Sequence, residues 1–152
     1  MKALVDSNVI IDFLSRREPF YAAARKLMLL GFVKEVELWI SASQVTDILY
    51  VLTGGGKPSL AAEAQEALKK LRSFIRVCSI GEAEIDALLE SAWDDLEDAS
   101  IHLAACKSKA DYIVTRNGKD FTRSTIKVVD AAAFIERLEQ DRGCAYEEVL
   151  LA

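Results

Sequence analysis

The sequence predicts an α/β protein, a single three-layer α/β/α domain built on a parallel sheet of about five strands. Short apolar runs rich in β-branched residues alternate with longer helical patterns, and this alternation requires crossover connections that make neighbouring strands parallel. The length of 152 residues matches one domain, and 51% of the residues are apolar, which is enough for a core. No internal repeat or linker divides the sequence.

The first predicted elements are a strand and two helices. Residues 3–5 form a short apolar run that ends at Asp6, which is typical of a buried strand. Residues 8–15 follow as the first helix. Pro19 opens the second helix, whose apolar residues recur three and four positions apart until Gly31, where a glycine is expected to end it.

The second strand is predicted at residues 38–40, which are Leu, Trp and Ile. Ser41 or Ser43 is suited to cap the helix that follows, because a serine hydroxyl accepts a hydrogen bond from a free backbone N–H group at a helix start. This helix carries Asp47 and is expected to end at the glycines 54–56.

The second half of the chain continues the alternation. An alanine-rich helix is expected from Pro58 to about Ser73, because proline suits the first helical turn. Only the last residues look loosely attached, so we expect a domain over residues 1–140 and a C-terminal tail over residues 141–152. The remaining strands are predicted at residues 74–78, 112–114 and 126–129, and the remaining helices at residues 82–91, at about 96–109 and from Ala131 onward.

Composition and charge exclude several classes of function. With 24 acidic against 19 basic residues the net charge is -5, so the protein does not coat nucleic acid by bulk charge, and a polyanionic substrate must be bound locally. The N-terminus lacks the length of a signal sequence, and no apolar run approaches the roughly 20 residues of a membrane span, so we expect a cytoplasmic protein. The cysteines Cys78, Cys106 and Cys144 form no C-x-x-C pair, which argues against a disulfide framework or a zinc site.

Several acids are placed where they can meet at one edge of the predicted sheet. Asp6 follows the first strand, and Asp47 lies one turn into the helix after the second strand. Asp120 lies with Asn117 in the loop after the fourth strand, and Asp98 lies on the helix before it. Ligands of open parallel sheets bind at the carboxyl ends of the strands. Carboxylates gathered there repel one another and are stable only with a divalent cation, so we expect a site for Mg²⁺ or Mn²⁺.

The helices that carry two of these acids are expected to place them differently. Asp47 has apolar neighbours, and an acid among core-facing residues needs a partner. Asp98 is expected to point away from the core along the sheet edge. The predicted buried stripe of its helix consists of Leu96, Ala99, Leu103, Cys106 and Ala110.

Other interpretations of single residues remain open. Asp6 is suited to accept a hydrogen bond in an Asx turn, and Asp120 is suited to cap a turn. Asp95 has the spacing of a helix N-cap rather than of a metal ligand. His102, the single histidine, lies one turn after Asp98 and is expected to bond that acid rather than a metal.

Three segments resemble motifs of PIN domains. Residues 4–12, LVDSNVIID, resemble the opening of these domains, in which an Asp and an Asn follow the first strand. Residues 95–99, DLEDA, resemble the third acidic motif, and residues 112–121, YIVTRNGKDF, resemble the fourth, particularly in the VapC-like branch. The similarity extends over residues 2 to about 138.

The resemblance implies a PIN-like fold and assigns roles to the acids. It makes Asp6, Asp47 and Asp98 the first three metal ligands, with the fourth position shared by Asn117 and Asp120. Many family members have Glu where this chain has the shorter Asp47, and Asp where it has Asn117.

The activity implied by the resemblance is that of a divalent-metal-dependent ribonuclease, with the four aspartates as catalytic residues. Carboxylates that hold Mg²⁺ or Mn²⁺ can support this chemistry, because the ion activates water and neutralises charge on the departing oxygen. Asn8 and Thr115 are expected to fix the carboxylates by hydrogen bonds. Arg116, Lys119 and also Arg16 are expected to contact RNA phosphates.

VapC-like proteins are typically toxins that form homodimers and are held inactive by an antitoxin, so the resemblance implies both kinds of partner. The alternative function is a non-catalytic PIN-fold module that binds RNA or a protein through a degenerate acid cluster. Apolar side chains of the first two helices are expected either to form the dimer contact or simply to be buried, namely Phe13, Leu14, Phe20, Met28 and Leu29.

Overall fold

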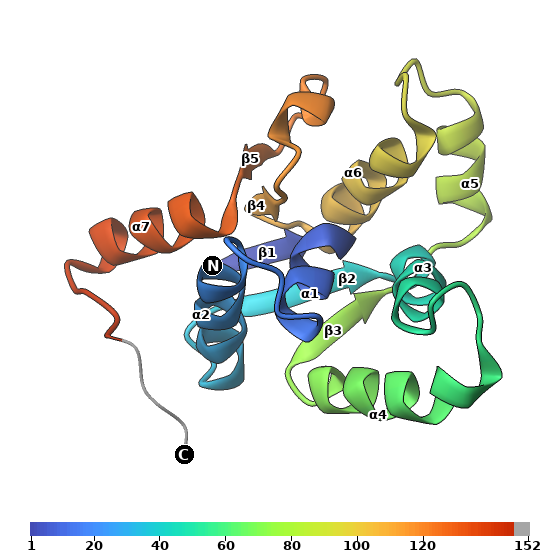
Figure 1. Cartoon of the computed structure of the whole chain (residues 1–152). Coiled ribbons are helices and arrows are strands. Elements are labelled where there is room, and N and C mark those ends of the chain that lie inside the picture. Colours follow the sequence, from blue (N-terminus) through green and yellow to red (C-terminus); the bar gives the residue numbers. More distant parts are fainter. Residues whose placement is uncertain (148–152) are drawn as a thin grey trace.

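The computed structural model describes residues 1–147 and contains a five-stranded sheet with helices on both faces (Figure 1). The strands are β1 (Lys2–Val5), β2 (Glu37–Ser41), β3 (Ile75–Cys78), β4 (Tyr112–Val114) and β5 (Lys127–Val129). They lie in the order β3-β2-β1-β4-β5, and every neighbouring pair is parallel. The predicted α/β class and the parallel sheet are confirmed.

Helices connect the strands as expected. They are α1 (Ser7–Leu14), α2 (Tyr21–Phe32), α3 (Ala42–Leu52), α4 (Ala61–Arg72), α5 (Glu82–Leu89), α6 (Leu96–Ser108) and α7 (Ala131–Arg142). Two short 3-10 helices are η1 (Pro58–Leu60) and η2 (Gly118–Phe121). None of the helices within residues 1–147 is long and apolar enough to cross a membrane.

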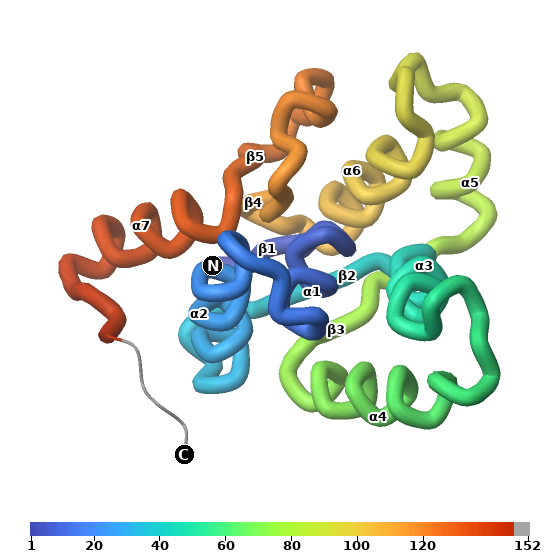
Figure 2. Tube along the Cα trace, viewed as in Figure 1, coloured from blue at the N-terminus to red at the C-terminus, as the bar shows by residue number. Residues whose placement is uncertain are grey.

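The strand order reverses at β1. The chain first places β2 and β3 on one side of β1 and then places β4 and β5 on the other side, a path that Figure 2 traces by colour. Val5 and Val114 are partners at the carboxyl ends of β1 and β4. A reversal of strand order is where ligands bind in open parallel sheets, so the residues that follow these two strands are the first candidates for a site.

Each face of the sheet has its own core. Successive residues of β1 point to opposite faces, and Ala3 and Val5 join one core with buried residues of α1, α2, α3, α4 and α7. Leu4 joins the other core with buried residues of α6, including Ile101. The predicted three layers are therefore present, with α6 on the opposite face from most other helices (Figure 1).

The predicted buried stripe of α6 is partly wrong. Leu96 and Cys106 are exposed, whereas the buried residues of the helix are Ala99, Ile101, Ala104, Ala105 and Ser108. Leu96 and Leu103 line a groove with Ile85 of α5, so the leucines serve the contact between α5 and α6. Small residues face the sheet, which lets the helix backbone lie close to it.

Gly31 was expected to end the second helix, but α2 continues to Phe32 and Gly31 is buried inside it. A Cβ atom at this position would lie 2.5 Å from Cδ1 of Leu38. The glycine is therefore needed for the close approach of α2 to β2 and not for helix termination.

The predicted tail, residues 141–152, lies partly outside the described residues. Within the described part, α7 extends to Arg142, and the backbone N–H of Tyr146 donates to Glu139. The Tyr146 hydroxyl donates to Glu35 at 3.0 Å, and the ring packs against the main core. The beginning of the tail is thus attached to the domain.

Candidate metal centre at the carboxyl edge of the sheet

Asp6 is buried at this edge, with 7% of its surface exposed. It directly follows β1 and is the N-cap of α1, where its carboxylate accepts a hydrogen bond from the Ser7 backbone N–H at 2.7 Å. The capping role that the sequence suggested is confirmed, and it does not exclude a second role. Burial raises the pKa of Asp6, although its hydrogen bonds act in the opposite direction.

Thr115 and Asn8 hold the second oxygen of this carboxylate. The Thr115 hydroxyl donates to Asp6 at 2.7 Å, and the Asn8 amide lies 3.4 Å from the same oxygen. The backbone N–H of Asn117 donates to the Thr115 hydroxyl oxygen at 3.1 Å. The predicted hydrogen bonds to Asp6 are therefore present, and they connect the ends of β1 and β4 across the point where strand order reverses.

Asp98 lies in the first turn of α6, next to the helix cap. Asp95 accepts hydrogen bonds from the backbone N–H groups of Glu97 and Asp98 at 2.9 and 3.1 Å, so its predicted capping role is confirmed. Burial raises the pKa of Asp98 to about 7, with further contributions from the charges of Asp95, Asp6, Asp120 and Glu97. The charges that act on Asp98 therefore come from the residue after β1, from the start of α6 and from η2.

The raised pKa of Asp98 predicts how stability depends on pH in metal-free protein. The folded-state pKa of about 7 exceeds the ordinary value of 3.8, so the unfolded chain releases this proton first as pH rises. The stabilising effect of the protonated form is complete below about pH 4 and is lost as pH rises to about 7. We expect the Asp98→Asn variant to lack this loss. The difference between its free energy of unfolding and that of wild type should therefore increase in favour of the variant from pH 5 to pH 8. Urea unfolding in chelator measures this difference, and a pH-independent difference contradicts the prediction.

Glu97 is an acid that sequence reasoning missed. Burial raises its pKa, and the charges of Asp47, Asp95 and Asp6 add to the effect. The available signal was the presence of three acids within four residues at the start of α6, at positions 95, 97 and 98. Glu97 is therefore a further oxygen donor on the side of the edge that faces α3.

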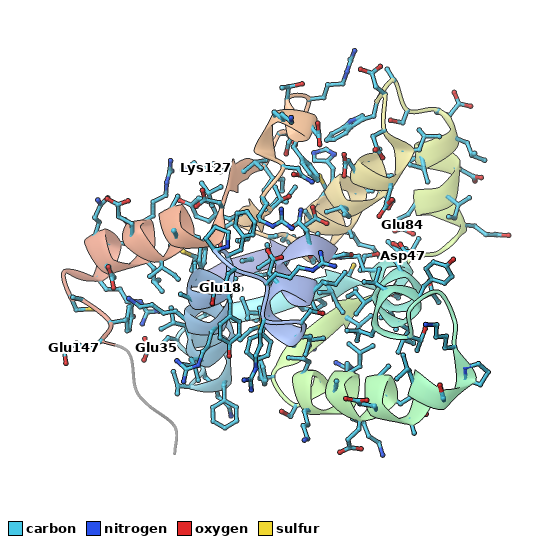
Figure 3. The ribbon with its side chains drawn as sticks, in the orientation of Figure 1. Glu18, Glu35, Asp47, Glu84, Lys127 and Glu147 are labelled. Carbon is cyan, nitrogen blue, oxygen red and sulfur yellow. The ribbon has the colours of Figure 1, made fainter. Side chains whose placement is uncertain are left out.

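Asp47 is exposed on α3, so the expectation that it sits among core-facing residues and needs a partner is wrong. Ile48 is fully buried, whereas Asp47 occupies the adjacent face of the helix, because neighbouring helical residues point about 100° apart. Figure 3 labels Asp47 between α3 and the α5–α6 pair in this view. The charge of Asp47 contributes to the raised pKa of Glu97, so Asp47 is within electrostatic range of this acid.

Asn117 and Asp120 enter the edge from the loop after β4. Asn117 immediately precedes η2, and Asp120 lies within it. The charge of Asp120 contributes to the raised pKa of Asp98, whereas the hydrogen bond of Asn117 that faces the site comes from its backbone. Of these two candidates for the fourth ligand, Asp120 thus has the clearer electrostatic link to the cluster.

Arg116, expected to contact phosphates, forms an ion pair with the buried Asp12. Its Nε and Nη2 atoms donate to the two carboxylate oxygens of Asp12 at 2.6 and 3.2 Å. Asp12 is 1% exposed, and the guanidinium lies 4.1 Å from the centroid of the Phe20 ring. Lys119 and Arg16 are exposed and have no ion-pair partner among residues 1–147, so they remain the candidates for phosphate contact.

The donor chemistry of this edge fits a hard divalent cation. The acids at this edge offer carboxylate oxygens, which Mg²⁺ and Mn²⁺ prefer. Among residues 1–147, however, no three His, Cys, Asp or Glu side chains are grouped closely enough to hold one ion together. Asp47 and Asp120 are exposed and Asp98 is half-buried, so these side chains have the rotational freedom to close around a cation, whereas Asp6 is fixed by its hydrogen bonds.

Comparisons with known proteins agree with this architecture. Residues 2–119 match a family model described as a PIN domain. The sequence has no significant match among curated proteins. Each of three similar solved structures is under 25% identical to this chain, so the likeness concerns the fold.

The structure of VapC20 of Mycobacterium tuberculosis, a Sarcin-Ricin loop cleaving toxin, has a TM-score of 0.63 at 14% identity and covers 83% of this chain and 98% of that chain. VapBC-1 of nontypeable Haemophilus influenzae has a TM-score of 0.60 at 18% identity, covering 87% and 99% of the two chains. VapBC2 of Rickettsia felis, bound to a promoter DNA fragment, has a TM-score of 0.59 at 18% identity, covering 86% and 98%.

Proposed function

The chain belongs to the PIN domain family, and on this premise we propose that it is a divalent-metal-dependent ribonuclease that hydrolyses phosphodiester bonds of RNA. The observation that carries the proposal is the group of acids around the carboxyl ends of β1 and β4. Burial, with a further contribution from the repulsion among these acids, raises the pKa of Asp98 to about 7. A divalent cation relieves this repulsion.

Each acid has a role in the proposal. Asp6, Asp47 and Asp98 hold the principal ion, directly or through water, and Asp120 with Asn117 completes the site. Bound Mg²⁺ or Mn²⁺ supplies activation of water and neutralisation of charge at the phosphate.

Other residues position the acids and the substrate. Thr115 and Asn8 keep the Asp6 carboxylate oriented toward the edge by the hydrogen bonds described above. Lys119 contacts a substrate phosphate. Arg116 acts through Asp12 to hold the start of the β4 loop against α1.

Binding of Mn²⁺ should stabilise the folded protein. A ligand that binds only the folded state at a concentration 100 times its Kd adds about 2.7 kcal/mol to the free energy of unfolding. We therefore expect a higher melting temperature with Mn²⁺ than with chelator in wild type, and a much smaller shift in the Asp98→Asn variant. Differential scanning fluorimetry measures both shifts.

The matched control for this experiment is the Asp141→Asn variant. Asp141 is an exposed acid in the last turn of α7, away from the cluster (Figure 1), so this variant should respond to Mn²⁺ like wild type. Equal shifts in all three proteins would mean that the ion binds elsewhere. Absence of any shift in wild type favours the alternative function, a non-catalytic module with a degenerate acid cluster.

We further propose that the protein is the toxin of a toxin–antitoxin pair in the cytoplasm, with an antitoxin protein as its partner. Support comes from the fold shared with VapBC complexes of two organisms and with a Sarcin-Ricin loop cleaving toxin.

A homodimer is part of the same proposal. Of the apolar side chains expected either at the dimer contact or in the core, Met28 is buried, whereas Phe20 is 41% exposed although the Arg116 guanidinium lies over its ring. Phe13, Leu14 and Leu29 are half-buried and pack against the main core or beside it. Large apolar side chains that are more exposed include Tyr50, Val51, Ile85, Leu89 and Leu96.

A further inference from the structure

A second feature borders the acid cluster, a cavity of about 380 Å³ between α5, α6 and the segment after η2. The loop that leads into α6 contributes Trp93 to its wall, and α6 contributes Ala99, His102 and Leu103. Arg123 closes the remaining side. The cavity is therefore lined by two aromatic rings, small apolar surfaces and one cation.

The aromatic wall has a defined arrangement. The rings of Trp93 and His102 are stacked with centroids 5.0 Å apart and an interplanar angle of 28°. Phe121 packs edge-on against Trp93 at 5.8 Å. Phe121 is 3% exposed and belongs to the core between α6 and the sheet. Trp93 therefore packs against a fixed residue of that core.

The sequence suggested that His102 bonds Asp98, but its ring instead lies against Thr125. Its Nε2 atom accepts a hydrogen bond from the Thr125 backbone N–H at 3.3 Å and lies 3.2 Å from the Thr125 hydroxyl. Burial lowers the pKa of His102, so the ring is neutral at pH 7. A neutral ring that accepts at Nε2 carries its proton on Nδ1, which makes Nδ1 a donor.

Three polar groups of the cavity wall, one each on Trp93, His102 and Arg123, have no partner within residues 1–147. The indole N–H of Trp93 and the Nδ1–H of His102 make no hydrogen bond there, and Arg123 makes neither an ion pair nor a hydrogen bond. Arg123 is also exposed. The residues that line the cavity thus include two aromatic rings, each with a free N–H donor, and an unpaired cation.

The cavity adjoins the candidate metal centre on two sides. His102 lies one turn after Asp98, so both side chains project from the same side of α6. Phe121, which supports Trp93, immediately follows Asp120 in the chain. A ligand in the cavity would therefore lie beside the acids that we propose as metal ligands.

We propose that this cavity binds a nucleobase of single-stranded RNA adjacent to the phosphodiester that is cut. The base stacks against the Trp93 and His102 wall, and Arg123 contacts a neighbouring phosphate. The donors of Trp93 and His102 favour a base edge that presents acceptors. The proposal rests on the proposed function for the identity of the substrate.

The net charge of the protein supports this mode of binding. At -5 the chain as a whole repels a polyanion, so affinity for RNA must come from contacts that do not depend on bulk charge. Stacking on aromatic rings provides such contacts because every base has a π face. A protein partner instead of RNA is the competing occupant, and the experiment below distinguishes the two.

Fluorescence titration in the presence of chelator tests the proposal without cleavage. The chain has two tryptophans, so the Trp39→Phe variant leaves Trp93 as the only indole reporter. The probe is a short single-stranded RNA of mixed sequence. We expect it to quench the Trp93 emission of the Trp39→Phe variant. In a separate titration that follows the anisotropy of the same RNA through a terminal fluorescent label, we expect its Kd to rise about tenfold in Trp93→Leu and several-fold in Arg123→Ala, relative to wild type.

The other tryptophan of the chain provides a matched control. The Arg76 guanidinium lies 4.8 Å from the centroid of the Trp39 ring, in a second arginine–tryptophan pair outside the cavity. The Arg76→Ala variant should bind the probe like wild type. Because Arg123 is exposed and unpaired within residues 1–147, Arg123→Ala keeps the test decisive should Trp93→Leu fail to fold.

The outcomes separate this inference from the proposed function. RNA binding that depends on Trp93, without any cleavage when Mn²⁺ is added, supports the cavity and overturns the nuclease. Metal-dependent cleavage with equal rates in wild type, Trp93→Leu and Arg123→Ala overturns the cavity alone. Variants that bind the probe normally but lose a protein partner also overturn it, because the site would then be a protein contact.

Discussion

Replacing Asp98 by asparagine is expected to lower Mn²⁺-dependent RNA cleavage by at least about 100-fold, because even outer partners of metal ligands cost 10–100-fold when removed. Asparagine has the size of aspartate but lacks its charge, and charge is what the cation requires. The measurement is the single-turnover cleavage rate of an RNA substrate at saturating Mn²⁺.

The same substitution should not damage the fold. The Asp98 carboxylate accepts no hydrogen bond within residues 1–147. Its negative charge is repelled by the like charges of four acids, namely Asp95, Asp6, Asp120 and Glu97. Removing that charge relieves repulsion, so the metal-free variant should be at least as stable as wild type at pH 8. Loss of activity therefore cannot be attributed to unfolding.

Asp141→Asn again serves as the control and should retain the wild-type rate. Full activity of Asp98→Asn would exclude Asp98 from the metal site and with it the assignment carried over from the third acidic motif. A variant that loses both activity and stability would also contradict the prediction, because it would make Asp98 a structural residue.

The Asp12→Ala substitution should be the most destabilising single change at this edge. Asp12 is 1% exposed and binds the Arg116 guanidinium through both carboxylate oxygens. Breaking a buried ion pair by removing one partner costs about 3–5 kcal/mol, because the other charge is left without compensation. The Arg116 side chain is 27% exposed and can turn partly to water, so we expect the lower end, about 3 kcal/mol.

A double substitution distinguishes the ion pair from general packing. Replacing both partners with apolar residues, as in Asp12→Leu with Arg116→Met, should recover much of the stability lost in Asp12→Ala. Urea unfolding with a constant m value measures the changes. The surface pair between Arg76 and Glu37 spans 3.9 Å with side chains 67% and 46% exposed, so Glu37→Ala should cost less than about 1 kcal/mol.

If Asp12→Ala and Glu37→Ala cost the same, the buried pair does not organise this edge. The pair matters for the site because Arg116 follows Thr115, which holds Asp6, and the Arg116 backbone N–H lies 3.4 Å from the Asn8 side-chain oxygen. We therefore expect the double variant to fold but to cleave RNA more slowly than wild type.

The sequence alone determined the succession of strands and helices along the chain and the carboxyl ends of the strands as the place of the candidate acids. These features depend on local rules: apolar periodicity assigns each element, and parallel strands present their carboxyl ends at one edge. The capping roles of Asp6 and Asp95 were equally predictable, because a cap and the backbone N–H groups it satisfies are neighbours in the chain.

Only the tertiary structure decided which distant side chains meet. Arg116 lies 104 residues from Asp12 in the sequence. The local sequence around either residue does not indicate that the two form an ion pair rather than contact solvent or substrate. The buried face of α6 depends on its packing against both the sheet and α5, so periodicity within the helix placed Leu96 and Cys106 incorrectly. The cavity beside Trp93 arises in the same way, because a local pattern fixes the direction of a side chain along its own element but not the surface that faces it.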